Sequence, residues 1–246
     1  MTNEPRLVDK VALVFGGSRG IGAAIVKQLA SDGASVALTY AKSPDKAAET
    51  ARAAEGLGVS VIMIKADSAD AEAVTDAVAQ TVARFGRLDI LVVNAGILIR
   101  GTVDTFALED FYRMVATNVR GVFVAIQASA PHLTDGGRII TIGSNTAVRT
   151  AFPGASVYSM TKGAIASLVR GVAIDLAPRG ITVNNIQPGP TATDMTAAYG
   201  EMVKPLVPLG RMGEPEEIAG LVAYLASARA GFITGASLTI DGGYVA

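Results

Sequence analysis

The feature that most constrains the fold is a regular alternation of short apolar runs with longer segments rich in alanine. The short runs are nearly uncharged and rich in β-branched residues, which is typical of strands buried on both faces of a parallel sheet. We expect strands at Val11–Phe15, Ser35–Thr39, Val59–Ile64, Ile90–Val93, Arg138–Ile142, Thr182–Ile186 and Ser237–Ile240. We expect helices at Ile21–Ser31, Asp45–Leu57, Ala71–Phe85, Leu108–Ser129, Tyr158–Ala177 and Pro215–Ala226. This order predicts right-handed strand–helix–strand units, and so an α/β fold with a doubly wound parallel sheet of about seven strands and helices on both faces.

The composition argues for a folded chain and against several classes of function. Hydrophobic residues make up 50% and charged residues 17% of the 246 residues, so the chain can bury enough surface to fold, and we expect one domain over residues 1–246. The 21 basic and 22 acidic residues nearly cancel and form no basic run, which argues against binding nucleic acid through its phosphates. The chain has no cysteine and one histidine, so we expect no metal site.

The same features predict a cellular location. No apolar stretch reaches the length of about 20 residues that spans a membrane, and the polar first ten residues lack the apolar core of a leader peptide. The lack of cysteine suits a reducing compartment. We therefore expect a cytoplasmic protein with no membrane partner.

A glycine-rich turn connects the first expected strand to the first expected helix. Gly16, Gly20 and Gly22 have the spacing G-x-x-x-G-x-G, with Ser18, Arg19 and Ile21 between them. Glycine allows a positive φ and lets a pyrophosphate approach the backbone without a Cβ in the way. The helix that follows would direct free N–H groups at the anion. A glycine-rich turn without a ligand has the same spacing, but the strand before it and the helix after it favour a phosphate site.

A second group of residues has the chemistry of an acid–base site. Ser144 ends the fifth expected strand, and Tyr158 and Lys162 follow at positions i and i+4 of one helix, about 5–6 Å apart at Cβ. A nearby ammonium lowers the pKa of a tyrosine from about 10, so that the phenol can exchange a proton near neutral pH. Ser144 could donate a hydrogen bond to a carbonyl oxygen that gains charge. A tyrosine–lysine pair also occurs on ordinary solvated helices, and it carries weight here because the serine and the glycine turn accompany it.

Together these motifs resemble those of the short-chain dehydrogenase/reductase family in its classical form. The family's first motif is T-G-x-x-x-G-x-G and its fourth strand ends in N-N-A-G; here Phe15 replaces the threonine and Val93 the first asparagine. The resemblance implies a Rossmann-type fold and reversible reduction of a ketone to a secondary alcohol. In the family, tyrosine is the acid/base, lysine lowers its pKa and binds the nicotinamide ribose, serine orients the substrate, and an asparagine on the middle helix completes a proton relay. It therefore implies the catalytic residues Asn118, Ser144, Tyr158 and Lys162.

The expected cofactor is NADP(H). An acidic residue at the end of the second strand would bind the adenosine ribose and favour NAD, but none follows Thr39 here. Arg19, Tyr40, Lys42 and Ser43 could instead bind a 2′-phosphate, although Arg19 and Lys42 could also be ordinary surface charges. The resemblance adds Asp67 and Ser68 at the adenine, the Asn94–Gly96 strand end, Pro188 and Gly189, and Thr191 and Thr193 at the carboxamide and pyrophosphate. The full set of expected cofactor contacts is Gly16, Ser18, Arg19, Gly20, Ile21, Gly22, Tyr40, Lys42, Ser43, Asp67, Ser68, Asn94, Ala95, Gly96, Tyr158, Lys162, Pro188, Gly189, Thr191 and Thr193.

These residues lead to the hypothesis of an NADPH-dependent carbonyl reductase, which in reverse is an alcohol dehydrogenase. They do not fix the substrate: a 3-oxoacyl thioester and a small or cyclic ketone are both compatible. An irregular segment at about 190–213 is the expected substrate lid, and its few charges favour apolar substrates. The alternatives are a regulatory protein that only binds a nucleotide on this fold and, less favoured in so short a chain, a sugar-nucleotide epimerase.

The sequence also predicts a homotetramer with dihedral symmetry. Two helical runs, Gly121–Ile126 and Ile165–Val169, carry no charge, and one sheet covers only one side of each helix. Members of the resembled family pair these two helices across a two-fold axis. The apolar C-terminal segment Leu238–Ala246 could pack across a second interface. The alternative is a monomer whose helices bury these runs internally.

Overall fold

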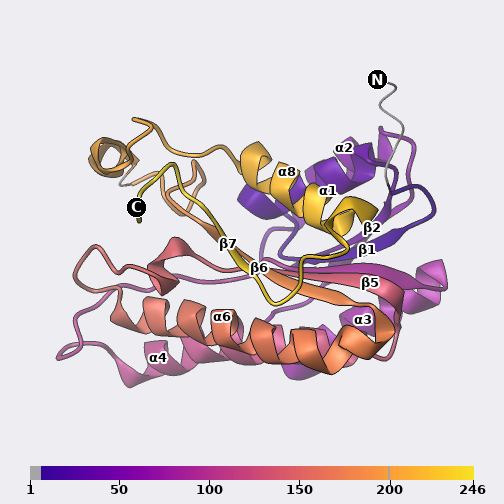
Figure 1. Cartoon of the computed structure of the whole chain (residues 1–246), viewed down its shortest axis with the longest axis horizontal. Coiled ribbons are helices and arrows are strands. Elements are labelled where there is room, and N and C mark those ends of the chain that lie inside the picture. Colours follow the sequence, from indigo (N-terminus) through magenta and orange to yellow (C-terminus); the bar gives the residue numbers. More distant parts are fainter. Residues whose placement is uncertain (1–6, 199) are drawn as a thin grey trace.

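The computed structural model describes residues 7–198 and 200–246 and contains one parallel sheet of seven strands (Figure 1). The strands are β1 (Val11–Phe15), β2 (Ser35–Tyr40), β3 (Val61–Lys65), β4 (Leu88–Val93), β5 (Leu133–Ile142), β6 (Thr182–Pro188) and β7 (Ser237–Ile240). They lie in the order β3-β2-β1-β4-β5-β6-β7, and every neighbouring pair is parallel. The chain therefore reverses its direction of winding between β1 and β4, where ligands bind at the carboxyl ends of such sheets. The predicted doubly wound sheet is confirmed.

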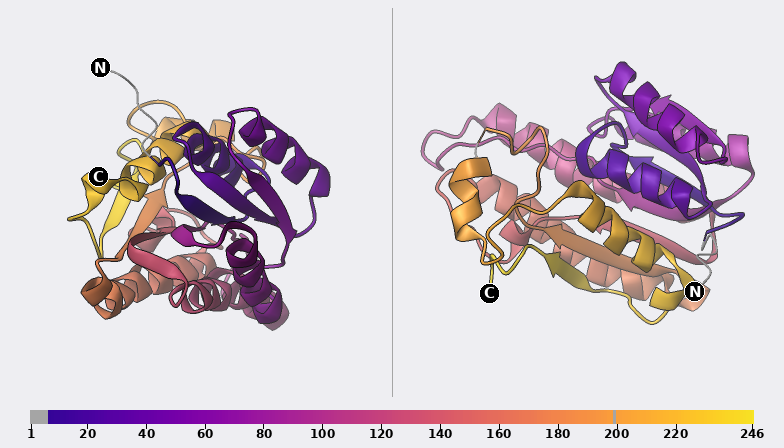
Figure 2. Two further views of the ribbon diagram at one scale, coloured as in Figure 1. Left: turned by 90° about the vertical axis from the view of Figure 1, so that its right-hand side faces the viewer. Right: turned by 90° about the horizontal axis from the view of Figure 1, so that it is seen from above.

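Helices cover both faces of this sheet (Figures 1 and 2). They are α1 (Gly20–Ser31), α2 (Pro44–Glu55), α3 (Ala71–Phe85), α4 (Leu108–Val115), α5 (Gly121–Ser129), α6 (Ser156–Leu176), α7 (Gly200–Val203) and α8 (Pro215–Ala226). Side chains of α1, α2 and α8 form one core with the sheet, and side chains of α3, α5 and α6 form the other. All positions of β1, β4 and β6 are buried. This explains why β1 is a continuous apolar run and why β4 departs from one only at Asp89. The buried polar residues of β6 are instead hydrogen-bonded, as Asn184 is to the Ile233 carbonyl.

Several helices begin and end where the sequence supplies a cap. The Asp70 side chain accepts hydrogen bonds from the backbone N–H groups of Glu72 and Ala73 at the start of α3. The same helix ends at Gly86, whose φ of 76° is the left-handed conformation that glycine adopts freely. Glu214 and Glu217 form a reciprocal capping box at the start of α8. These local interactions fix the helix ends independently of the core.

The prediction of one continuous helix over Leu108–Ser129 is wrong at its centre. A π-helical segment of five residues, Ala116–Arg120, separates α4 from α5. The Asn118 side chain within it bonds both backbone groups of Ile97, at 2.9 Å each, and α5 starts at Gly121, where a Cβ would lie 2.1 Å from the Ser68 carbonyl oxygen. Contacts with two loops thus determine the local winding, and such π-helical segments are frequent at functional sites.

Several other predicted boundaries differ from the structure by one to five residues. β5 begins at Leu133 instead of Arg138, because two glycines interrupt its apolar run. α6 begins at Ser156, two residues before Tyr158, and β3 covers Val61–Lys65 rather than Val59–Ile64. The types of the elements are nevertheless as predicted.

Asp89 ties together the strands at the amino-terminal edge of the sheet. Its buried carboxylate accepts hydrogen bonds from the Val11 backbone N–H at 3.0 Å and the Thr134 hydroxyl at 3.0 Å, and it pairs with Arg87 and Lys10. Burial alone would raise the pKa of Asp89, but the hydrogen bonds from Arg87, Val11 and Thr134 outweigh it, so the pKa is lowered. This carboxylate therefore links β1, β4 and β5 at the edge opposite the strand ends that bear the predicted site.

The segment between β6 and α8 passes over the carboxyl-terminal edge. It contains α7 and a short 3-10 helix at Lys204–Leu206, and a parallel bridge joins Thr191 to Gly213. Val203 and Val207 are buried in a small separate cluster with Tyr244 and Phe152. In the described part of the chain, no helix is long and apolar enough to cross a membrane.

Candidate active site

The glycine turn leaves space for a ligand, because side chains at these positions would fill that space. Gly16 and Gly20 have φ values of 75° and 53°, and a Cβ on Gly22 would lie 2.0 Å from the Gly16 carbonyl oxygen. Arg19 precedes α1 and makes no side-chain capping hydrogen bond, so the first N–H groups of this helix have no cap. An anion bound at this turn would accept hydrogen bonds from them.

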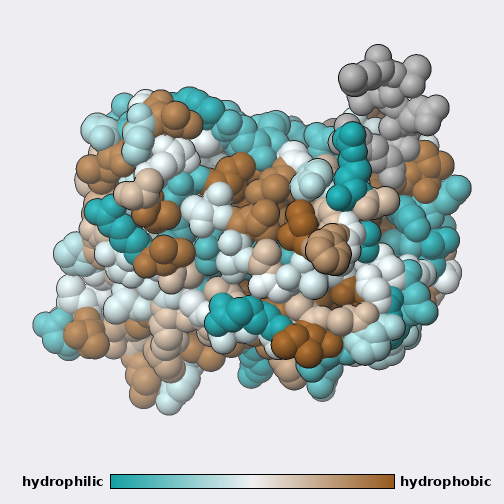
Figure 3. Space-filling view, viewed as in Figure 1, coloured by the Kyte–Doolittle hydropathy of each residue, from teal (hydrophilic) through white to brown (hydrophobic). Residues whose placement is uncertain are grey.

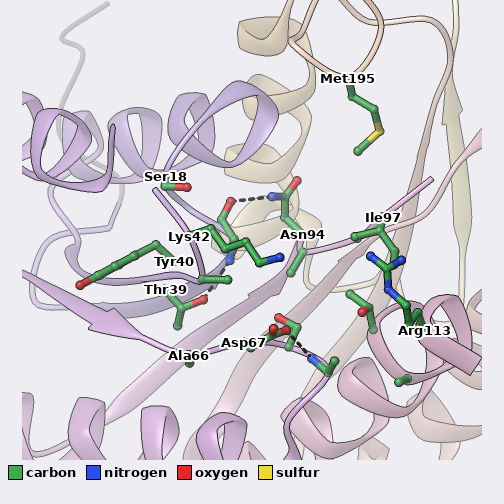
Figure 4. Close-up of a pocket in the computed structure, with 18 of the residues that line it drawn as sticks. Ser18, Thr39, Tyr40, Lys42, Ala66, Asp67, Asn94, Ile97, Arg113 and Met195 are labelled. Atoms are coloured by element: carbon green, nitrogen blue, oxygen red, sulfur yellow. Dashed lines mark hydrogen bonds between the residues drawn. The ribbon is translucent and has the colours of Figure 1, made fainter. Parts of the chain in front are cut away.

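The turn is held in place by the ends of two neighbouring strands. The Thr39 hydroxyl accepts a hydrogen bond from the Gly16 N–H at 3.0 Å, and the Asn94 amide donates to the Gly16 carbonyl at 2.9 Å (Figure 4). Phe15 is buried, and its carbonyl accepts from the backbone N–H groups of Asn94 and Ala95. A hydroxyl from β2 therefore braces a turn in which phenylalanine replaces the family's threonine. The sequence analysis did not include Thr39, although its place at the end of a strand beside the turn was a signal.

A cavity of about 1120 Å³ lies over this turn at the carboxyl ends of β1 to β4 (Figure 4). The predicted cofactor residues that line it are Gly16, Ser18, Arg19, Gly20, Ile21, Tyr40, Lys42, Ser43, Asp67, Ser68, Asn94, Ala95, Gly96 and Thr193. Gly22 does not line it and instead packs beneath the turn. The cavity extends to α4, where Tyr112 and Arg113 complete its wall, two residues that the sequence motifs did not mark.

Asp194 connects the segment after β6 to the glycine turn and to α2. Its carboxylate lies 3.4 Å from Arg19 Nη1 and 2.7 Å from Lys46 Nζ. The hydrogen bond from Lys46 and its charge, followed by Arg19, lower the pKa of Asp194. Arg19 is thus held at the rim of the large cavity by a carboxylate from a segment far along the chain.

A second cavity of about 200 Å³ adjoins the first and contains the reacting residues. The two share Ile21, Asn94, Gly96, Thr193 and Met195. The predicted residues that line the second cavity are Ile21, Asn94, Gly96, Ser144, Tyr158, Lys162, Pro188, Gly189, Thr191 and Thr193. The structure therefore brings Ser144 and the two α6 residues to one wall, beside the space over the glycine turn.

Lys162 is buried beneath Tyr158. Its ammonium donates to the Ile142 carbonyl at 2.9 Å and lies 5.6 Å from the centre of the Tyr158 ring. Burial lowers the pKa of Lys162 to about 8. The group is therefore largely protonated at neutral pH and is a positive charge next to the phenol.

Ser144 lies in the same wall with its hydroxyl already oriented. Its oxygen accepts hydrogen bonds from the Thr146 N–H at 3.2 Å and the Thr146 hydroxyl at 3.0 Å. Both donors come from a 3-10 turn, Asn145–Ala147, that Ser144 caps. Because the Ser144 oxygen accepts these two hydrogen bonds, its O–H group points away from Thr146. It could therefore donate a hydrogen bond to a carbonyl oxygen in the cavity.

Asn118 lines neither cavity. It is buried, bonds both backbone groups of Ile97, and donates to the Thr161 hydroxyl at 3.2 Å. A Cβ on Gly96 would lie 3.4 Å from the Asn118 side-chain oxygen and 3.5 Å from Lys162 Nζ. Asn118 thus links the loop after β4 to α6, close to the buried ammonium. The sequence analysis missed Thr161, which lies three residues after Tyr158 on the same helix.

The second cavity is also lined by residues that the sequence motifs did not mark, among them Arg100, Arg149, Phe152 and Tyr244. Arg149 Nη1 donates to the Tyr244 carbonyl at 3.2 Å. Burial raises the pKa of Tyr244, while the charge of Arg149 opposes that rise. Contacts between residues this far apart in the chain depend on the loop paths, so no local pattern could have predicted them.

Comparisons with known proteins cover almost the whole chain. A family model described as enoyl-(acyl carrier protein) reductase matches residues 16–245. A cyclic-di-GMP-binding biofilm dispersal mediator protein of Escherichia coli K12 is 43% identical over 238 residues, which cover 96% of this chain and 97% of that protein.

Solved structures with the same architecture include two from bacteria. A short-chain dehydrogenase/reductase from Serratia marcescens is 57% identical, with a TM-score of 0.96 and coverage of 98% of this chain and all of that one. A short-chain dehydrogenase from Burkholderia cenocepacia in complex with NADP is 47% identical, with the same TM-score and coverage. With a family model that matches almost the whole chain and relatives this similar along their full length, the chain belongs to the short-chain dehydrogenase/reductase family.

Proposed function

We propose that this protein is an NADP(H)-dependent carbonyl reductase that converts a ketone to a secondary alcohol and catalyses the reverse oxidation. The observation that carries the proposal is the position of Ser144, Tyr158 and Lys162 on one wall of a cavity that opens to the space over the glycine turn. The reductase named by the matching family model and the NADP bound to the Burkholderia relative support it.

The large cavity fits the cofactor. Its glycine turn has no side chain where a pyrophosphate would lie, and Gly16 closes against the Ala95 backbone. Arg19, Lys42 and Ser43 line the rim beside the end of β2, and the sequence has no acidic residue at that strand end. Arg19 and Lys42 would neutralise this phosphate, and Tyr40 and Ser43 would border it. When bound, NADPH supplies the hydride.

The residues of the small cavity supply the remaining steps. Ser144 donates a hydrogen bond to the ketone oxygen and orients it. Tyr158 transfers its hydroxyl proton to this oxygen as negative charge develops there. The buried Lys162 ammonium stabilises the tyrosinate that is left behind. Asn118 bonds Ile97 and Thr161 close to Lys162. In this position it would support the relay that returns a proton to Tyr158 after each turnover.

The experiment that tests this function is the Tyr158→Phe variant. The substitution keeps the ring and removes the acid, so kcat for ketone reduction should fall about 10²–10⁴-fold, while the dissociation constant for NADPH, measured by fluorescence titration, should stay the same. Tyr224→Phe on α8, outside both cavities, is the matched control and should keep full activity. Near-wild-type turnover by Tyr158→Phe would remove Tyr158 as the acid.

A second candidate is binding of cyclic di-GMP without catalysis, which the name of the Escherichia coli relative supports. The four catalytic positions argue for turnover instead. A ketone panel with NADPH, run beside a titration with cyclic di-GMP, separates the two: binding without any NADPH oxidation would favour the regulatory role.

The proposal extends to the surroundings of the site. We infer that the chain is one domain in which residues 190–213 form a lid over the small cavity, supported by the ion pairs of Asp194 and the cluster of Val203 with Tyr244. We also infer a homotetramer, supported by exposed apolar side chains on α5, α6 and the segment after α8. The cysteine-free composition supports a cytoplasmic location.

A further inference from the structure

The small cavity has a marked imbalance of charge. Arg100 and Arg149 line it together with the catalytic Lys162. Among the described residues, no aspartate or glutamate lines this cavity. Its other walls include apolar side chains such as Leu98, Phe152 and Val203. A ligand that matches this lining has an apolar body and at least one negative charge.

Arg149 is positioned to bind that charge. Its Nη1 donates a hydrogen bond to the Tyr244 carbonyl at 3.2 Å, and both residues line the cavity. The carboxylate of Asp241, in the same C-terminal segment, is engaged by Asn145 and by the backbone N–H groups of Gly243 and Val245. Within the part of the chain that the structure covers, no carboxylate forms an ion pair with Arg149. A guanidinium has five N–H donors, and among the described residues the Arg149 side chain has one hydrogen-bond acceptor, the Tyr244 carbonyl.

Arg149 is also close to Ser144 along the chain. It follows Ser144 by five residues, and the compact 3-10 turn Asn145–Ala147 lies between them. The Arg149 backbone N–H closes this turn on the Asn145 carbonyl at 3.1 Å. A 3-10 turn rises only about 2 Å per residue, so the charge-binding group starts close to the group that would orient the ketone.

We propose that the substrate of this site is a compact ketone that carries a carboxylate, and that Arg149 binds this carboxylate. The inference rests on the proposed carbonyl reduction and specifies its substrate class. A carboxylate accepts two parallel hydrogen bonds from one guanidinium. A pantetheine thioester fits less well, because its phosphate lies at the far end of a long arm, whereas Arg149 and Ser144 line the same cavity of about 200 Å³.

The test compares acids with their neutral esters. The purified full chain with NADPH is assayed with 4-acetylbenzoate and its methyl ester, and with 5-oxohexanoate and its methyl ester. We expect kcat/KM to be at least about tenfold higher for each acid, mainly through KM, because a hydrogen bond to a charged group adds about this factor. Acetoacetyl-CoA is assayed in parallel and should show no dependence on Arg149.

Three variants assign the effect to Arg149. Arg149→Gln should reduce the acid-to-ester ratio of kcat/KM to about one, and Arg149→Lys should retain part of it. Arg52→Gln, at an exposed position of α2 outside both cavities, should leave the ratio unchanged. Calorimetric titration of 4-acetylbenzoate onto each variant with NADP⁺ measures binding without turnover, and Arg149→Gln should weaken it about tenfold.

The outcomes separate this inference from the function on which it rests. Equal kcat/KM for acids and esters, or an equal loss on both in Arg149→Gln, would overturn the inference and leave the reductase intact. A loss with acetoacetyl-CoA alone would assign Arg149 to a thioester and also overturn it. No NADPH oxidation by any ketone would overturn the proposed reduction, and the inference with it.

Discussion

At the scale of single residues, the chemistry of the site depends more on which side chains are buried than on their spacing in the sequence. The sequence could predict that Tyr158 and Lys162 share one helix face, because that depends only on helical periodicity. It could not predict that the Lys162 ammonium is buried against the Ile142 carbonyl, because this contact depends on how α6 packs on β5. Arg149 and Tyr244 were missed for the same reason.

The buried ammonium of Lys162 should make the ligand-free protein less stable than it would be without the charge. With a pKa of about 8 in the folded state and 10.5 as its ordinary value, the folded protein binds fewer protons than the unfolded chain between these pH values. The free energy of unfolding therefore rises with pH from 8 to 10.5, and the penalty is fully present below pH 8.

We expect Lys162→Met to raise the free energy of unfolding at pH 7 by about 1–2 kcal/mol, after the lost hydrogen bond to Ile142 is subtracted. The gain should shrink as the pH rises from 8 to 10. Urea denaturation across this pH range measures it, with Lys27→Met on the exposed side of α1 as the control. A less stable Lys162→Met protein at pH 7 would show that the ammonium contributes net stability.

The charges at the rim of the large cavity should determine the choice of cofactor. We expect wild-type kcat/KM to favour NADPH over NADH, because Arg19 and Lys42 line the rim beside the end of β2, where the 2′-phosphate would lie. Arg19→Gln should lower kcat/KM for NADPH about tenfold, the value of one charged hydrogen bond, and change it little for NADH. A wild-type preference for NADH would show that the missing carboxylate after β2 was misinterpreted.

At the scale of elements, the sequence predicted which segments are strands and helices but not where they depart from regular geometry. The alternation of apolar and amphipathic segments indicates which segments are strands and which are helices, because the hydrophobic periodicity of a strand differs from that of a helix. The π-helical segment Ala116–Arg120 has no such periodicity, since contacts of Asn118 with Ile97 and of Gly121 with Ser68 produce it. Many of the predicted cofactor residues lie at the carboxyl ends of strands, and their placement at one edge therefore followed from the prediction of a parallel sheet.

The junction between the glycine turn and α1 should tolerate no side chain at Gly22. A Cβ there would lie 2.0 Å from the Gly16 carbonyl oxygen and 2.6 Å from the Asn94 amide, and these two atoms are already hydrogen-bonded. We expect Gly22→Ala to lower the free energy of unfolding by about 1–3 kcal/mol through overpacking and to weaken NADPH binding.

The matched control is Gly220→Ala in the middle of α8, where a Cβ would meet nothing within 4 Å. This variant should be more stable by about 0.5–1 kcal/mol, because alanine favours a helix over glycine. Denaturation curves and NADPH titrations of both variants measure these effects. Equal stability of Gly22→Ala and wild type would mean that the turn is more adaptable than its contacts indicate.

At the scale of the whole molecule, apolar side chains remain exposed on two separate surfaces. Phe123, Met160 and Ile174 lie on α5 and α6, whereas Tyr224 and Phe232 lie on α8 and the segment after it. Figure 3 shows hydrophobic residues gathered over α8. Two such surfaces on one chain are what an assembly with two different two-fold interfaces requires.

We expect light scattering to give a mass of about 100 kDa, that of four 25.1-kDa chains. Phe123→Glu and Phe232→Glu should each reduce this mass to about half by opening one of the two interfaces, and the double variant should be monomeric. Arg52→Gln serves as the control with unchanged mass. A mass of one chain for the wild type at micromolar concentration would contradict the tetramer.

The Asp89 cluster has a consequence for how this protein can evolve. Its carboxylate joins β1, β4 and β5 at the amino-terminal edge of the sheet, whereas the loops that border both cavities leave from the opposite edge. Substitutions in those loops therefore leave the strand anchor untouched, and mutation can alter substrate preference while the scaffold is inherited unchanged. Descendants of one ancestral chain can in this way diverge toward many substrates at little risk of failing to fold.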